Sequence, residues 1–108
     1  MKTLKFAPHL VENILAGEKT STWRLFDDKD LKVGDALAFL NKATLERFGT
    51  AVITSLYSKT LGTLTDEDWA GHERFPSEKE MYDTYRKYYG DNVDRDSEVK
   101  ILTFDFKK

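Results

Sequence analysis

The stretch Gly17-Glu18-Lys19-Thr20-Ser21-Thr22-Trp23-Arg24 combines a turn glycine, basic side chains and hydroxyl side chains within a short span. Threonine and tryptophan favour a pleated, half-buried surface, so we expect a strand from Thr20 onward. A glycine just before this strand is typical of the end of a preceding element. The stretch therefore predicts a tight turn that leads directly into a strand.

The alternation of side chains along this strand divides it into two faces. Thr20, Thr22 and Arg24 are expected on one face, and Ser21 and Trp23 on the other. The first face would carry two hydroxyl groups and a guanidinium, which are all groups that bind polar ligands. We therefore expect the ligand-facing side of the strand to be the one with Thr22 and Arg24.

Lys19 stands at the entry to the strand, beside Gly17. A side chain at this point need not obey the alternation, so Lys19 could bend toward Thr22. A cation, a hydroxyl and the guanidinium of Arg24 would then converge on one place, which is a candidate site.

A short strand and a short helix are expected before this stretch. Lys2 to Ala7 alternates polar and apolar residues, which predicts a first strand. Pro8 is suited to open a helix, since its missing N–H would be unpaired there. Apolar residues follow at helical spacing, and Gly17 is placed to end the helix in a left-handed conformation.

Three further strands are predicted downstream, with 41–47 ambiguous between a loop and a wide hairpin. They are expected at Ala36 to Leu40, Thr50 to Tyr57 and Val99 to Phe106, after a turn signal at 32–35.

Two helical insertions are expected between the last two of these strands. Thr65 to Asp68 predicts the start of a short helix that carries Trp69. Ser77 predicts the N-cap of a second helix, with Glu80 completing a capping box. This helix carries an apolar and aromatic stripe, for which we favour core packing over base stacking. The stripe consists of Met81, Tyr85, Tyr88 and Tyr89.

The composition is that of one soluble α+β domain covering residues 1–108. Hydrophobic residues make up 40% and charged residues 33% of the 108 residues, which suits a compact core with a charged surface. Short strands interrupted by helices favour a small curled sheet or barrel of five to six strands, whose closure would remove exposed edges. We expect two or three short helices, and a monomer or weak dimer.

Charge and cysteine usage exclude several function classes. The formal net charge of −2 argues against a wide nucleic-acid interface, but it permits a small basic pocket. The absence of cysteine excludes disulfides and thiolate sites. With no membrane-length apolar run and no signal-like segment, a cytoplasmic location is expected. We interpret the acidic groups at Asp27, Asp28 and Asp30, at 66–68 and at 91–98 as solvated loops.

The residues able to do chemistry are few. The two histidines, His9 and His72, lack carboxylates at ligand spacing, so no metal site is expected. His72 precedes Glu73 on a segment between two predicted helices, which is either a site loop or a surface loop. A threonine becomes a nucleophile when a neighbour removes its proton, and a lysine with a lowered pKa can do so. Thr22, Lys19 and Glu73 could therefore act as nucleophile, base and acid.

The motif Gly17-x-Lys19-Thr20-x-Thr22-x-Arg24 resembles the signature of the ASCH domain, a relative of the PUA RNA-binding fold. The turn signal at 32–35 and the segment at 72–75 stand at the places this family leads us to expect. The resemblance covers nearly the whole chain. It implies a PUA-like β-barrel with a cleft along the strand of the motif.

Some small bacterial members of that family hydrolyse N4-acetylcytidine to cytidine, and we expect no cofactor for this chain. The resemblance implies Lys19 as base, Thr22 as nucleophile and Glu73 as acid and base in such a reaction. Substrate contacts are expected from Thr20, Arg24, Trp23 and His72.

Trp23 stands where relatives carry an aliphatic residue, so it either repacks the core or reshapes the cleft. Other members bind or cleave RNA, and fold membership alone does not fix the activity. The partner expected from the sequence is a nucleoside or a short single-stranded RNA. An amidohydrolase of N4-acylated cytidine is the leading hypothesis, with a non-catalytic RNA-binding module and a ribonuclease using Lys19 and Glu73 as alternatives.

Overall fold

A computed structural model describes residues 1–27 and 29–108 of the chain. It contains five strands, two α-helices and two 3₁₀ turns in the following order: β1 (Lys2–Phe6), α1 (Pro8–Leu15), β2 (Ser21–Leu25), β3 (Ala36–Asn41), β4 (Arg47–Thr60), η1 (Leu61–Thr63), η2 (Asp66–Trp69), α2 (Glu78–Tyr89) and β5 (Glu98–Lys107).

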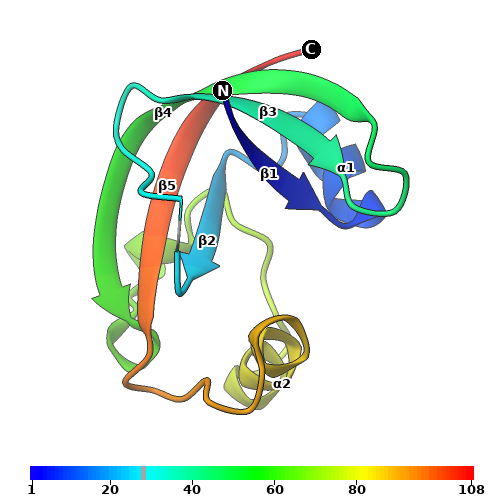
Figure 1. The fold of residues 1–108 in the computed structure, drawn as a ribbon. Coiled ribbons are helices and arrows are strands. Elements are labelled where there is room, and N and C mark those ends of the chain that lie inside the picture. The colour runs from blue at the N-terminus through cyan, green and yellow to red at the C-terminus, as the bar shows by residue number, and fades with distance from the viewer. Residues whose placement is uncertain (28) are drawn as a thin grey trace.

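The strands form one mixed, curled sheet in the order β1-β3-β4-β5-β2 (Figure 1). β1 runs parallel to β3, and the other neighbours are antiparallel. The predicted α+β class with a small curled sheet of five to six strands is thus confirmed. The sheet is a half-barrel rather than a closed one, because β1 and β2 are its edges.

The side chain of Arg24 links the two edge strands. Arg24 on β2 donates a hydrogen bond to the backbone oxygen of Lys5 on β1, at 3.1 Å. Its guanidinium carbon also lies 4.9 Å from the centre of the Phe6 ring, which is a cation–π contact. Arg24 therefore lies at the seam that a closed barrel would fill with a strand ladder.

Two hydrophobic cores lie on opposite faces of β2 and β5. Leu102 belongs to the first core, together with Phe6, Phe39 and the α1 residues Leu10 and Ile14. These α1 side chains come from the apolar stripe that the sequence spacing predicted, which explains why the short helix packs against the sheet.

The second core lies between the sheet and α2. Trp23 and Ile101 pack there with Met81 and Tyr85 of the helix. In the ladder between β2 and β5, Trp23 pairs with Ile101, and Thr22 pairs with Leu102 of the first core. The predicted alternation along β2 is therefore confirmed, with Thr22 and Trp23 on opposite faces.

Local signals in the sequence place most element ends. Pro8 occupies the first turn of α1, and Gly17 follows the helix with φ +77°. The Ser77 side chain accepts a hydrogen bond from the backbone N–H of Glu80, as an N-cap should. The boundaries of β4 differ from prediction, because this strand extends over 47–60. The short helix predicted to carry Trp69 is present as a 3₁₀ helix, Asp66–Trp69.

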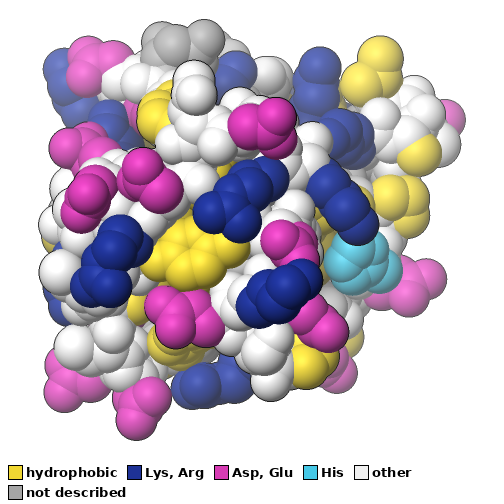
Figure 2. Space-filling model, turned by 90° about the horizontal axis from the view of Figure 1, so that it is seen from below, with side chains coloured by type: hydrophobic (Ala, Val, Ile, Leu, Met, Phe, Trp, Pro, Cys, Tyr) yellow, Lys and Arg dark blue, Asp and Glu magenta, His cyan; other side chains and the backbone are white. Residues whose placement is uncertain are grey.

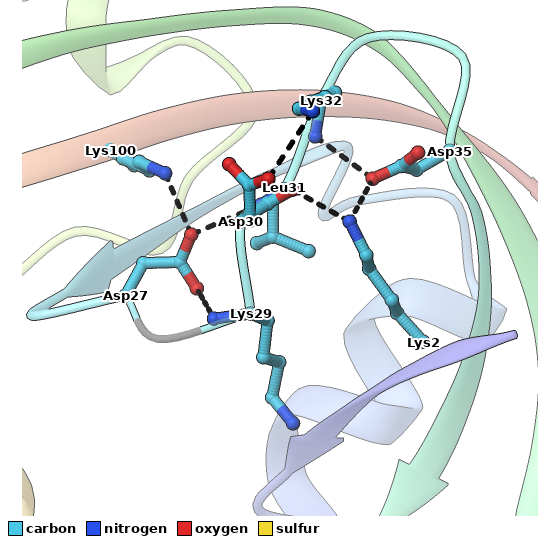
Figure 3. Close-up of polar contacts among 8 residues, drawn as sticks. All are labelled: Lys2, Asp27, Lys29, Asp30, Leu31, Lys32, Asp35 and Lys100. Carbon is cyan, nitrogen blue, oxygen red and sulfur yellow. Dashed lines mark hydrogen bonds and ion pairs between the residues drawn. The ribbon is translucent and has the colours of Figure 1, made fainter.

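The interpretation of the acidic groups as solvated loops is wrong at two positions. The Asp27 side chain is only 3% exposed, and it accepts a hydrogen bond at 2.8 Å from Lys100 Nζ (Figure 3). Asp68 is equally buried and accepts from Tyr57 and Lys59. Buried carboxylates need such partners, and these two tie a loop to the sheet. Asp28 lies outside the described residues.

The segment that follows Asp27 is also fastened to the edge of the sheet. Lys2 of β1 donates to the Asp35 carboxylate at 2.8 Å and to the backbone oxygen of Asp30 at 2.6 Å (Figure 3). These contacts hold the connection between β2 and β3 against β1.

Candidate functional site

A cavity of about 240 Å³ opens beside β2, between the seam of the half-barrel and α2. Thr22, Trp23 and Arg24 of β2 line it, together with His72 and Glu73 from the segment between η2 and α2. The structure thus brings five of the seven predicted site residues to one hollow.

Lys19, the sixth, lies behind this cavity and reaches it through Glu73. Its side chain is 1% exposed, and Nζ donates to Glu73 Oε1 at 2.5 Å and to the backbone oxygen of Ser21 at 2.7 Å. The Glu73 side chain is 24% exposed, so the pair is buried at the amine and open at the carboxylate.

Burial is the main influence on the protonation of Lys19. Desolvation lowers the pKa of the amine below its usual value, the Glu73 carboxylate opposes this, and the Arg24 cation adds a small further decrease. The free amine is therefore more accessible for Lys19 than for an exposed lysine. A lysine in this state can accept a proton.

His72 is held as a neutral ring. Desolvation is the largest cause that lowers its pKa to about 4, and the nearby Lys19 charge contributes. Nδ1 lies 2.7 Å from the backbone oxygen of Glu73, so this nitrogen carries the proton and donates. Nε2 then accepts from the Tyr85 hydroxyl at 3.3 Å. The ring is fixed at both ends and positions the Glu73 segment.

Trp23 has both of the roles that the sequence left open. It is 2% exposed within the second core, and it also lines the cavity. Its ring stacks on His72 with centres 4.0 Å apart and meets Trp69 at 4.5 Å. Trp23 therefore supports the segment that carries Glu73.

Thr20 is the predicted site residue that the structure does not bring to the cavity. Its backbone N–H and that of Ser21 both donate to the backbone oxygen of Gly71. Its hydroxyl packs against the Gly71 α-carbon. Thr20 thus joins the entry of β2 to the segment that precedes His72.

Gly71 at this junction cannot accept a side chain. Its φ of +74° is left-handed, and a Cβ there would overlap the Thr20 hydroxyl. We expect Gly71→Ala to lower the free energy of unfolding by about 2–4 kcal/mol, measured by urea denaturation.

Gly17→Ala is the matched control for this substitution. Gly17 has a similar φ of +77° but open space around its α-carbon. Gly17→Ala should lower the free energy of unfolding by only about 1 kcal/mol, which is the cost of the left-handed backbone for alanine. Adding Thr20→Ala to Gly71→Ala should remove the overlap and restore the stability that Gly71→Ala loses beyond Gly17→Ala. Equal losses of stability in Gly71→Ala and Gly17→Ala would contradict the predicted overlap.

Two residues that line the cavity each carry a buried polar hydrogen without a partner. Trp23 Nε1 and Arg24 Nε are both buried, and neither has a hydrogen-bond partner within the described part of the chain. Buried donors usually have a partner, so a small local movement would be needed for either of these donors to reach a ligand in the cavity.

Sequence reasoning missed several residues that complete the cavity. Lys5 of β1, Lys42 after β3, and Tyr88 and Tyr89 of α2 also line it. The stripe on α2 divides, because Met81 and Tyr85 are buried as predicted while Tyr88 is half exposed. The helical spacing was the only signal for the tyrosines. Lys5 lies on β1 and Lys42 in the turn after β3, and no local pattern specifies that these two segments meet β2.

The surface at the α2 end carries both positively and negatively charged side chains. Basic and acidic side chains alternate around a hydrophobic patch (Figure 2). Lys42 Nζ lies 5.2 Å from the centre of the Tyr88 ring. Lys42 and Tyr88 thus form a small basic and aromatic area on a surface that carries charges of both signs. Such an area suits a small anionic or aromatic ligand better than a long polyanion.

No group of histidine and carboxylate side chains that could hold a metal ion occurs among residues 1–27 and 29–108. Within those same ranges, no helix has both the length and the apolar character to cross a membrane.

Comparison with solved structures identifies the fold. Protein EF3133 from Enterococcus faecalis superposes with a TM-score of 0.76 at 14% identity, over 91% of this chain and 69% of that one. The ASCH domain from Lactobacillus crispatus gives a TM-score of 0.66 at 18% identity, over 88% and 68%. Protein PF0455 from Pyrococcus furiosus gives 0.70 at 16% identity, over 99% and 97%. No family model and no curated protein matches the sequence.

The chain therefore has the fold of ASCH domains, as the motif in β2 predicted. At these identities the likeness concerns the fold alone, and the chemistry has to be argued from the cavity.

Proposed function

We propose that this protein is an ASCH-type amidohydrolase that removes the acyl group from N4-acylated cytidine, with no metal or cofactor. The observation that carries this proposal is the buried Lys19–Glu73 pair, whose carboxylate opens into the cavity lined by Thr22. The motif around Lys19 resembles that of small amidohydrolases with the same three residue types. Residues 1–108 would act as one cytoplasmic domain.

In the first half of the reaction, Thr22 is the nucleophile. The Lys19 amine takes the hydroxyl proton as Thr22 Oγ1 attacks the acyl carbonyl carbon. The C–N bond of the tetrahedral intermediate then breaks. The leaving N4 amine receives a proton from Glu73, which has received the former Thr22 proton from Lys19 across their hydrogen bond. Cytidine leaves and the acyl group remains as an ester on Thr22.

In the second half, water releases the acyl group. Glu73 and Lys19 accept the proton of the attacking water, the ester C–O bond breaks, and Thr22 Oγ1 regains its proton. The products are cytidine and the carboxylic acid, so one amide bond and one water molecule are consumed. The lowered pKa of Lys19 supports its role, because only the free amine can begin the cycle.

The other cavity residues suit recognition of a nucleobase. The hollow of about 240 Å³ is small for a drug-sized ligand, whose sites start at roughly 300 Å³, and so suits a single nucleoside. Tyr88 and Tyr89 offer ring faces for stacking. Arg24 also lines the cavity, and a guanidinium donates hydrogen bonds to carbonyl oxygens.

The alternative is a non-catalytic RNA-binding module that uses the same cavity. The observation that favours it is the set of cations at the mouth, from Lys5, Arg24 and Lys42, beside the exposed Tyr88. A short single strand could place a base on the ring and its phosphates on these cations. A ribonuclease would instead use Lys19 and Glu73 as base and acid on the RNA backbone.

The test is incubation of the purified protein with N4-acetylcytidine in the presence of a chelator. We expect stoichiometric release of acetate and cytidine. An inactive protein whose affinity for a short RNA falls as salt rises would instead indicate the binding module, because phosphate contacts release counterions. RNA cleavage that disappears in Glu73→Gln would indicate the ribonuclease.

A further inference from the structure

A second cavity, of about 390 Å³, adjoins the first on the other side of Arg24. Both hollows are lined by Lys5, Arg24 and Tyr89, so they share a wall. Arg24 forms this boundary because it reaches from β2 to the backbone oxygen of Lys5 on β1. A ligand in the first cavity could therefore extend past the guanidinium into the second.

The second cavity is basic. Lys5, Arg24 and Lys29 line it, and Asp27 is its only carboxylate among the described residues. Asp27 is already neutralised by Lys100 at 2.8 Å and accepts backbone hydrogen bonds as well. The Lys29 side chain extends away from Asp27 toward β1 (Figure 3). Among the described lining residues, the charge that remains for a ligand is therefore positive.

Arg24 places a guanidinium at the boundary between the two cavities. One terminal nitrogen donates to the Lys5 backbone oxygen, and the guanidinium lies over the Phe6 ring. Nε is buried without a partner in the described ranges. A guanidinium has five N–H donors in a planar fork that matches a phosphate group.

The outer wall of this cavity is built from two aromatic rings. Phe26 is 56% exposed and lies edge-on to Tyr89 with ring centres 6.0 Å apart. Its φ of +51° is left-handed, which is costly for a bulky side chain. Such costly conformations concentrate at ligand sites. Here the conformation places a ring beside the basic residues.

We propose, resting on the hydrolase function proposed above, that the second cavity binds the phosphate of an N4-acylated cytidine nucleotide whose base occupies the first cavity. Lys29 and Arg24 hold the phosphate, and Arg24 bridges the two subsites. The preferred substrate is then a nucleotide rather than the free nucleoside.

The experiment compares kcat/KM for N4-acetylcytidine with kcat/KM for its 5′- and 3′-monophosphates. We expect one of the two phosphates to react at least about tenfold faster than the nucleoside, since charge-assisted phosphate contacts are worth this much. Lys29→Gln should reduce that preference several-fold and leave the nucleoside rate unchanged, because Lys29 lines only the second cavity. Lys87→Gln, at an exposed position that lines neither cavity, is the matched control.

Equal rates for nucleoside and nucleotides would overturn the phosphate subsite while leaving the hydrolase intact. A preference for a monophosphate that Lys29→Gln does not change would also overturn the phosphate subsite. If none of the substrates is hydrolysed, the hydrolase proposal fails, and titrations of cytidine and of cytidine monophosphates into the protein decide the subsite separately. The phosphate subsite is supported if a monophosphate binds more tightly than cytidine and Lys29→Gln weakens that binding. It is overturned if cytidine and its monophosphates bind equally.

Discussion

Thr22→Val is expected to reduce the kcat of acetate release from N4-acetylcytidine by at least about 10³-fold, because it removes the proposed nucleophile. Valine keeps the shape and β-branching of threonine at a position that is nearly buried in β2. The fold should therefore survive, with an unfolding free energy within about 1 kcal/mol of the wild type. Steady-state kinetics and urea denaturation on the same samples measure both quantities.

Thr22→Ser is the conservative control, because it restores a hydroxyl at the same place. It should keep activity within about 10- to 100-fold of the wild type, since a serine can form the same ester. Lys19→Met should match the loss of Thr22→Val, and the double variant should be no worse than either, because a nucleophile and its base act as a unit. Full turnover in Thr22→Val would eliminate the assigned nucleophile.

The pH profile of the wild type adds a readout that a merely structural lysine would not produce. The proposed base works as the free amine, so kcat should rise with pH until Lys19 has lost its proton. Burial lowers the pKa of Lys19, so the rise should end below the usual lysine range. A rate that is independent of pH across this range would argue against Lys19 as base.

The parts of the fold that follow from short-range chemistry were predictable. Pro8, Gly17 and Ser77 act within one turn of the chain, and each marks the element end that the structure shows. The order of the strands was not predictable in this way. The parallel pairing of β1 with β3 and the position of β5 between β4 and β2 depend on contacts across most of the chain.

The candidate site likewise combines features that local sequence predicts with features that depend on contacts between distant residues. Alternation along β2 placed Thr22 and Arg24 on one face, since the period of a strand is a local property. The burial of Lys19 could not be inferred, because lysines are almost always exposed unless paired. Its partner Glu73 is 54 residues away in sequence. The second cavity was likewise invisible, because it exists only where the two edge strands approach each other.

Acidification is expected to destabilise the protein mainly through His72, by on the order of 3 kcal/mol between pH 7 and pH 4. The pKa of this ring is about 4 in the folded state, against the ordinary 6.5 in the unfolded chain. Between these values the unfolded state binds the additional proton, so stability falls as pH falls through this window. Above pH 6.5 neither state is protonated and the full stability is present. Asp68, with a pKa of about 2, acts only at lower pH.

Urea denaturation at a series of pH values measures this slope, and His72→Asn should flatten it, because an amide does not titrate. His9→Asn is the control, since it removes the other histidine at an exposed position and should leave the slope unchanged. His72→Asn also loses the Trp23 stack, so the imidazole signals of His9→Asn give a second measurement on an intact fold. They should stay constant from pH 8 to pH 5 and shift near pH 4. A His72 signal that titrates near pH 6.5 would mean that the ring is not sealed between Trp23 and Tyr85, and the Glu73 segment would then lose its support.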